Sequence, residues 1–120
     1  MAGAVNQFRD GFRQLMSHSK ESITYQTITR ARDTDDNPVE TPVDSSIYAI
    51  VQILRLEDIQ EIGGMWQVGD AMVFFDHNAT VTKEDKIVHQ SITYRIVDII
   101  PERVKGSLIF IQAMCKREEY

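Results

Sequence analysis

Hydrophobic and polar residues alternate with a period of two over much of the chain, most clearly across residues 84–100. Side chains alternate across a β-strand, so residues of one parity share a face. Four residues are predicted to point inward together: Ile92, Tyr94, Ile96 and Ile100. Gln90-Ser91 interrupts the alternation and predicts a tight turn, although it lacks the Asn-Gly or Asp-Gly typical of such hairpins. The segment therefore predicts a hairpin that other strands must complete.

Residues 21–32 are rich in Ile, Thr and Tyr and predict a strand. Ile23 and Tyr25 fall on one face and Ile28 on the other, which predicts a bulge near Gln26-Thr27. Further strand-like runs, separated by turn residues, occupy residues 46–56, 68–76 and 108–115, with a break at Pro101, and residues 80–82 predict a short strand or an extended connector. Five to six short antiparallel strands of this kind predict a mostly β fold, a small barrel or sandwich.

An amphipathic helix is predicted over residues 5–17, because apolar residues recur there at helical spacing. Its stripe consists of Val5, Phe8, Phe12, Leu15 and Met16. Gly11 weakens the helix by about 1 kcal/mol relative to alanine. Two interpretations follow: the stripe covers one end of its own domain, or Phe8, Phe12 and Leu15 dock on a partner subunit.

The run at residues 46–56 is apolar at both parities, and a strand that is apolar on both faces must be covered on both. The N-terminal helix is one candidate cover and a neighbouring subunit is another. We expect Ile47, Val51 or Ile53 at a subunit contact. After this strand, a helical turn is predicted at residues 57–61 and a break at Gly63-Gly64.

The net charge of −5 has one location, because residues 33–44 contain five acidic residues and no basic one. The acids are Asp33, Asp35, Asp36, Glu40 and Asp44. With two prolines and few apolar residues, this segment is predicted to be a long mobile loop. The expected organisation is a helical segment at 1–20, a β-domain at 21–117 containing the extended loop 33–44, and a charged tail at 118–120.

Composition limits the function further. Cys115 is the only cysteine, which excludes an intrachain disulfide, and it is expected in the core. No apolar run approaches the roughly 20 residues of a membrane span, and no leader is evident, so a soluble protein made in the cytoplasm is expected. An acidic chain without a basic cluster also lacks the charge that drives most nucleic-acid binding.

Catalytic and metal-binding patterns are weak. His18, His77 and His89 include no pair at the helical spacing of zinc motifs, and no nucleophile elbow, phosphate loop or dinucleotide fingerprint occurs. Paired carboxylates are abundant only in the predicted loop, where nothing would hold them at a catalytic separation. We therefore expect no enzyme activity, no metal and no cofactor.

Two short motifs carry a family resemblance. Asp85-Lys86-Ile87, a short turn, and then Tyr94-Arg95-Ile96-Val97-Asp98-Ile99 follow an extended loop and precede one last strand. This pattern resembles the head-closure proteins of tailed bacteriophages, also called stopper or head-completion proteins, over roughly residues 20 to 117. It departs from theirs in having Gln90-Ser91 in place of a glycine-containing turn and in its N-terminal helix.

The resemblance implies a β-barrel subunit of the virion neck, in the head-to-tail connector. Such subunits form a ring under the portal, close the head to retain packaged double-stranded DNA, and give tail proteins a docking surface. The loop 33–44 corresponds to one that projects into the channel, where a ring would concentrate its negative charge and repel DNA phosphates. The implied partners are further copies of the chain, a portal or adaptor protein, tail proteins and passing DNA, with no membrane.

Three alternatives remain open, the least favoured of which is a small hydrolase or metal enzyme. A tail-terminator or tail-completion ring is a close neighbour of the first interpretation. An oligonucleotide-binding barrel would be a different class, with Tyr25, Tyr48 and Tyr94 as stacking residues.

Overall fold

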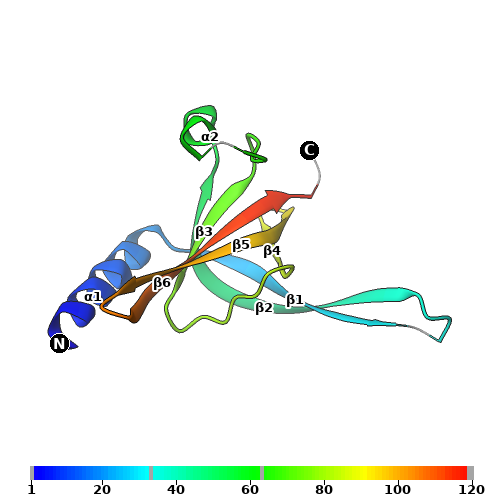
Figure 1. Ribbon diagram of the computed structural model, residues 1–120, viewed down its shortest axis with the longest axis horizontal. Coiled ribbons are helices and arrows are strands. Elements are labelled where there is room, and N and C mark those ends of the chain that lie inside the picture. The colour runs from blue at the N-terminus through cyan, green and yellow to red at the C-terminus, as the bar shows by residue number, and fades with distance from the viewer. Residues whose placement is uncertain (1, 33, 63, 119–120) are drawn as a thin grey trace.

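The computed structural model describes residues 2–32, 34–62 and 64–118, and six strands follow an N-terminal helix (Figure 1). The elements are α1 (Ala2–Ser19), β1 (Glu21–Arg32), β2 (Pro38–Ile53), α2 (Leu56–Ile62), β3 (Ala71–Asp76), β4 (Lys86–His89), β5 (Ile92–Val104) and β6 (Ser107–Arg117). All neighbouring strands pair antiparallel. The sheet closes on itself in the order β1-β2-β3-β6-β5-β4, and we call this closed sheet the barrel. The predicted mostly β fold with one N-terminal helix is confirmed.

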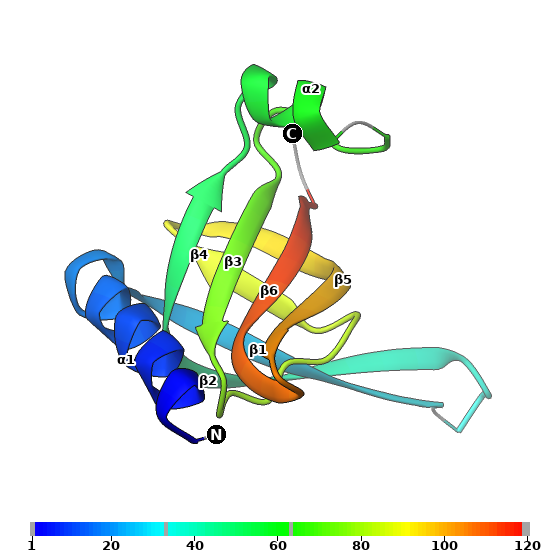
Figure 2. The same cartoon turned by 60° about the vertical axis from the view of Figure 1, so that its left-hand side comes forward.

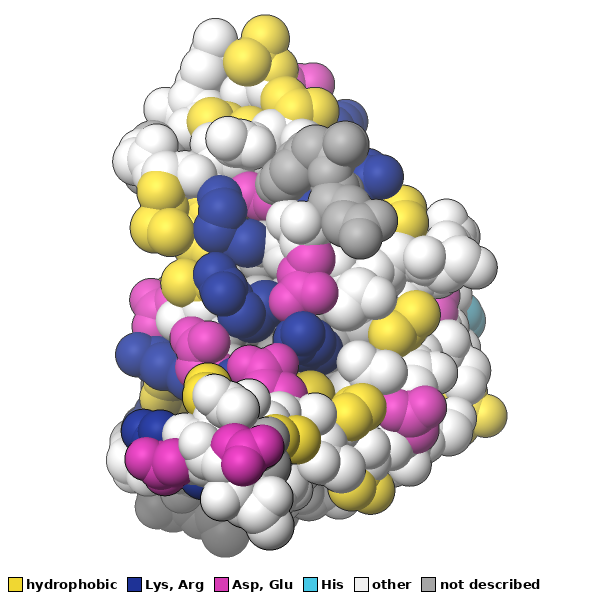
Figure 3. All heavy atoms as spheres, turned by 90° about the vertical axis from the view of Figure 1, so that its right-hand side faces the viewer, with side chains coloured by type: hydrophobic (Ala, Val, Ile, Leu, Met, Phe, Trp, Pro, Cys, Tyr) yellow, Lys and Arg dark blue, Asp and Glu magenta, His cyan; other side chains and the backbone are white. Residues whose placement is uncertain are grey.

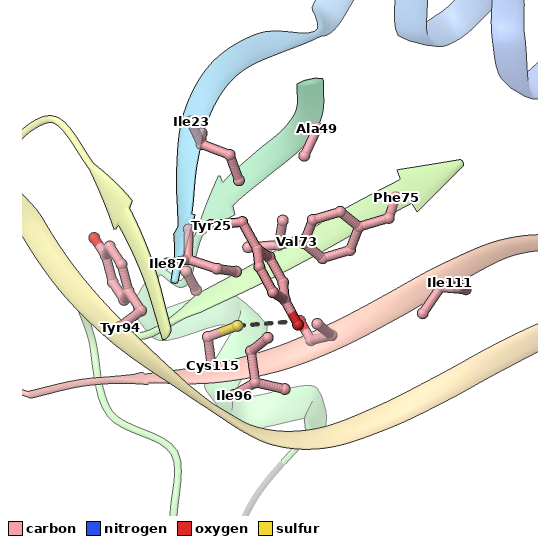
Figure 4. Close-up of a cluster of buried hydrophobic side chains, with 12 residues drawn as sticks. Ile23, Tyr25, Ala49, Val73, Phe75, Ile87, Tyr94, Ile96, Ile111 and Cys115 are labelled. Atoms are coloured by element: carbon pink, nitrogen blue, oxygen red, sulfur yellow. Dashed lines mark hydrogen bonds between the residues drawn. The ribbon is translucent and has the colours of Figure 1, made fainter. Parts of the chain in front are cut away.

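The interior of the barrel is filled by the inward parity of each strand, as alternation requires. In β3, Ala71, Val73 and Phe75 are buried, whereas the residues between them are half-buried. Figure 4 shows ten labelled side chains of this core: Ile23, Tyr25, Ala49, Val73, Phe75, Ile87, Tyr94, Ile96, Ile111 and Cys115. Cys115 is fully buried, which confirms its predicted place in the core.

Helix α1 covers an outer face of the barrel (Figure 2). The ring of Phe12 stacks on that of Phe110 with centroids 4.9 Å apart, and Met16 is buried beside it. Arg9 Nε donates a hydrogen bond to the carbonyl of Leu108 at 3.0 Å. The first interpretation of the helix, as a cover for its own domain, is confirmed for this half of its apolar stripe.

The prediction that Ile100 faces inward with Ile96 is wrong. The register between β5 and β6 shifts between Ile96 and Asp98, so an extra residue in β5 reverses the parity beyond it. Ile99 packs against the core instead, and Ile100 is 39% exposed. β5 also continues through Pro101, where a break was predicted. By contrast, the β1–β2 register runs without a shift, so the bulge predicted near Gln26-Thr27 is not present in that pairing.

The predicted tight turn at Gln90-Ser91 and helical turn at residues 57–61 are both confirmed. Gln90 and Ser91 have φ values of 50° and 65°, the left-handed region that two-residue hairpin turns require. Gln90 and Ser91 are uncommon residue types in such a turn, but their backbone conformation is the one usual for it.

The largest correction concerns the predicted loop 33–44. Its residues from Pro38 onward belong to β2, which pairs continuously with β1 from Arg32↔Pro38 inward. β1 pairs with β4 only as far as Gln26, so the outer halves of β1 and β2 leave the barrel as a two-stranded hairpin (Figure 1). We call residues 27–44 the arm. Prolines are tolerated in its strand because each strand of the arm has only one partner.

Candidate assembly surface

The arm leaves the barrel at a buried carboxylate, that of Asp85 just before β4. Asp85 is 6% exposed and accepts hydrogen bonds from the Tyr25 hydroxyl at 2.7 Å and the Ile28 backbone N–H at 3.0 Å. The Thr82 N–H in turn donates to the Tyr25 hydroxyl at 3.1 Å. Burial, together with the hydrogen bond to Asp85, raises the pKa of Tyr25. Asp85 thus holds β1 at the point where its pairing with β4 ends, which fixes the base of the arm.

Charged side chains of both signs gather on one side of the face from which the arm projects (Figure 3). They are Arg30, Lys86 and Arg95 with Glu40, Glu84 and Glu118. Lys86 Nζ lies 3.0 Å from Glu118, and Arg30 lies 3.5 Å from Glu40. Exposed pairs of this kind contribute little stability each. Their main consequence is that this face is electrically balanced.

This balance changes the interpretation of the predicted acidic segment. Glu40 is compensated by Arg30 and by Lys86 at 3.7 Å, so it is not a free negative charge. Asp35 and Asp36 lie in the turn at the tip, where Asp36 is 3.7 Å from Arg32. Asp44 lies on β2 opposite Gln26, near the base of the arm. Asp33 lies outside the described residues.

The far end of the barrel is held by a second buried carboxylate, Asp70. Its oxygens accept hydrogen bonds from Lys116 Nζ at 3.0 Å and from the Arg117 N–H at 2.9 Å. Lys116 also donates to the Met65 carbonyl at 2.7 Å, which ties the β2–β3 connection to β6. Sequence reasoning missed both carboxylates as structural elements. The available signal was parity, since Asp85 shares its parity with the inward-facing Ile87.

The β2 side chains that were predicted to form a subunit contact pack in part against other residues of the same chain. Ile47 and Val51 are half-buried and pack against the barrel core, so the chain itself covers part of each side chain, and their place at a subunit contact stays a prediction. On the opposite face, Ile50 packs in the cluster formed with α1. Both apolar faces are therefore partly covered within the chain, whereas Ile53 is 39% exposed on one face and Tyr48 is 58% exposed on the other.

Helix α1 divides its predicted contact residues between two environments. Phe12 is buried against β6, so the structure assigns it to the intramolecular contact. Phe8 and Leu15 are 56% and 54% exposed on the neighbouring strip of the same helix. These two residues remain available to another molecule.

The three tyrosines proposed to stack on nucleic-acid bases lie in two different environments. Tyr25 and Tyr94 are buried in the core, so the prediction that they stack on bases is wrong, while Tyr48 is exposed beneath Lys20 at 4.5 Å. Burial raises the pKa of the Cys115 thiol to about 12. Partial burial acts to raise the pKa of Asp76, but hydrogen bonds from His77 outweigh it and the net shift is downward.

The described part of the chain contains no cluster of three or more His, Cys, Asp or Glu side chains arranged to hold a metal ion. Among its helices, none has the length and apolar character needed to cross a membrane. A cavity of about 470 Å³ between α1, β2 and the β3–β4 connection is lined in part by Arg13 and Asp76, whose side chains lie 3.6 Å apart as an ion pair. The arm and the outer strip of α1 are two prominent exposed features, beside the exposed apolar side chains of Leu56, Met65 and Val68 around α2.

Comparison with known proteins shows a likeness of fold without a likeness of sequence family. No protein-family model and no curated protein sequence matches the chain. The fold is similar to the solution structure of protein SF1141 from Shigella flexneri 2a, with a TM-score of 0.66 and 16% sequence identity. The match covers 82% of this chain and 91% of SF1141. At this identity the likeness concerns the fold alone.

Proposed function

We propose that the chain is a structural subunit of a tailed-bacteriophage neck, which assembles as a ring under the portal. In this role it closes the head, retains packaged DNA and offers a surface to the tail. The observation that carries the proposal is the arm, a two-stranded projection whose outer part no other described element of the chain covers. The motif resemblance over roughly residues 20 to 117 supports the same role.

The activity in this proposal is contact between subunits, with no reaction and no cofactor. Rings of identical subunits bring equivalent projections around one axis. The tip residues Asp35 and Asp36 would then place negative charge near passing DNA, where repulsion keeps the duplex from adhering. Replacing both by asparagine is expected to slow DNA passage or alter its retention in assembled heads. Unchanged retention and release would remove the tip from the proposal.

The direct test is negative-stain microscopy of the full chain with and without a portal ring from the same phage. We expect rings that cap the portal. The matched control shortens the arm by replacing residues 30–40 with Asn-Gly between Thr29 and Thr41. These two residues face each other across the ladder, and Asn-Gly suits a two-residue hairpin. This variant should fold but lose ring formation, whereas a wild-type monomer indifferent to the portal would refute the role.

Adding purified tail tubes to this microscopy experiment separates the tail-terminator alternative. Rings that bind the end of a tail tube and ignore the portal would favour a tail-terminator or tail-completion subunit. The oligonucleotide-binding alternative is weakened, because two of its three stacking residues are enclosed in the core.

A further inference from the structure

The two faces of the arm differ in chemistry. The residues of one parity carry no charge: Thr27, Thr29, Ala31, Val39, Thr41 and Val43. All of these side chains except Ala31 are β-branched. We call this set the uncharged face. It continues the parity of Ile23 and Tyr25, so it is the inner face of the barrel extended beyond the core. Val39 and Val43 are 39% and 58% exposed there.

The edges of the arm are less suited to association than this face. The Ile28 N–H points away from β2, because it donates to Asp85. Pro42 pairs with Ile28 across the ladder, so its backbone nitrogen likewise points away from β1 and lies on the outer edge of β2. Pro38, four residues away, has the same orientation. Both lack an N–H, and Glu40 lies between them. Prolines and charges on an edge discourage the addition of another strand.

A second uncovered apolar strip lies on α1. At 100° per residue, Phe8 and Leu15 lie within about 20° of each other around the helix. They flank the strip formed by Phe12 and Met16, which is buried against β6. The apolar stripe of α1 is thus wider than the surface of the barrel that covers it.

The two uncovered surfaces lie at opposite ends of a molecule about 55 Å long, as Figures 1 and 2 show. We propose that the uncharged face of the arm of one copy docks on the Phe8–Leu15 strip of α1 in the next copy. The inference rests on the proposed function and names the contact that would build the ring. Because the two surfaces differ, the contact is heterologous, and repeating it produces a ring or a filament.

Charge favours this pairing over arm-to-arm contact. The arm contains two arginines and five acidic residues, a formal net charge of −3, of which the ion pair between Glu40 and Lys86 compensates one. Helix α1 contains two arginines and one aspartate, and Lys20 follows it directly. Two arms would repel each other, whereas an arm and a helix attract.

The contact is small. A six-residue length of arm is about 20 Å long, and two strands are about 10 Å wide. The area of this face is therefore well below the roughly 800 Å² that each partner buries in a stable complex. A single contact is therefore weak, and dilute protein should be monomeric. Closing a ring gives every subunit two contacts, so assembly should depend steeply on concentration or on a template such as the portal.

Cysteine crosslinking tests the contact directly, since the natural Cys115 is fully buried in the folded chain and burial raises the pKa of its thiol. Val43→Cys and Leu15→Cys are made separately, one with a mass tag, then mixed at high concentration and treated with a short bismaleimide. We expect mixed dimers, and a ladder of larger products from the chain carrying both substitutions. Leu15→Cys mixed with the exposed-site variant Glu102→Cys is the control.

Each result decides the question. Mixed dimers in excess of the control support the head-to-tail contact. Homodimers of either single variant, or mixed dimers no more abundant than in the control, overturn it. Rings on the portal without Val43–Leu15 crosslinking would refute this contact and leave the proposed function standing. A crosslinked ladder from protein that does not bind the portal would support this contact and refute the proposed function.

Discussion

Replacement of Asp85 by alanine is expected to be among the most damaging single changes to this fold. Its carboxylate accepts hydrogen bonds from the Tyr25 hydroxyl and the Ile28 N–H, and the side chain is buried. A hydrogen bond to a charged group contributes about 1.5–3 kcal/mol, so losing two should lower the free energy of unfolding by about 3–6 kcal/mol. A domain of this size is stable by only about 5–15 kcal/mol. Asp85→Ala should therefore be marginally folded.

The assay is equilibrium urea unfolding followed by circular dichroism. Asp85→Asn keeps one oxygen as an acceptor for the Ile28 N–H, so a smaller loss of about 1.5–3 kcal/mol is expected and the variant should remain measurable. Glu84→Ala is the matched control, because it removes the same charge from the adjacent, exposed residue. Its ion pairs are on the surface, and it should lose less than about 1 kcal/mol. Equal losses for Glu84→Ala and Asp85→Ala would refute the reasoning.

Three further predictions concern backbone conformation and ionisation. Gly11→Ala should raise the free energy of unfolding by about 1 kcal/mol, because a Cβ there meets nothing within 4 Å; unchanged thermal stability would contradict this. Gln90→Asn combined with Ser91→Gly should stabilise by about 1 kcal/mol in urea unfolding, since both positions have positive φ, and destabilisation would count against the assigned turn. Burial raises the pKa of Cys115 from 9.0 to about 12 and also raises that of Tyr25, so both groups ionise more readily in the unfolded chain. Stability should be fully present below pH 9 and fall above it by about 1.4 kcal/mol per pH unit for each group that ionises only on unfolding. A free energy of unfolding that stays the same from pH 8 to pH 11 would contradict this prediction.

Local pattern predicted the parts of the fold that depend only on neighbouring residues. The alternation of residues 71–76 matches the burial of β3, the spacing of Phe12 and Met16 matches the buried side of α1, and the interruption at Gln90-Ser91 matches a hairpin turn. The buried Cys115 followed from its apolar strand. Each of these features follows from backbone periodicity, which is present in the sequence itself.

Features that depend on a distant partner were decided by the tertiary structure. Residues 38–44 form a strand because β1 lies beside them, although their prolines and acids predicted a loop. The bulge that turns Ile100 outward is visible only in the register against β6. Whether an apolar side chain is covered depends on which element reaches it. The sequence determined that Phe8, Phe12 and Leu15 share a helix face, and only the packing of α1 on the barrel left Phe8 and Leu15 for another molecule.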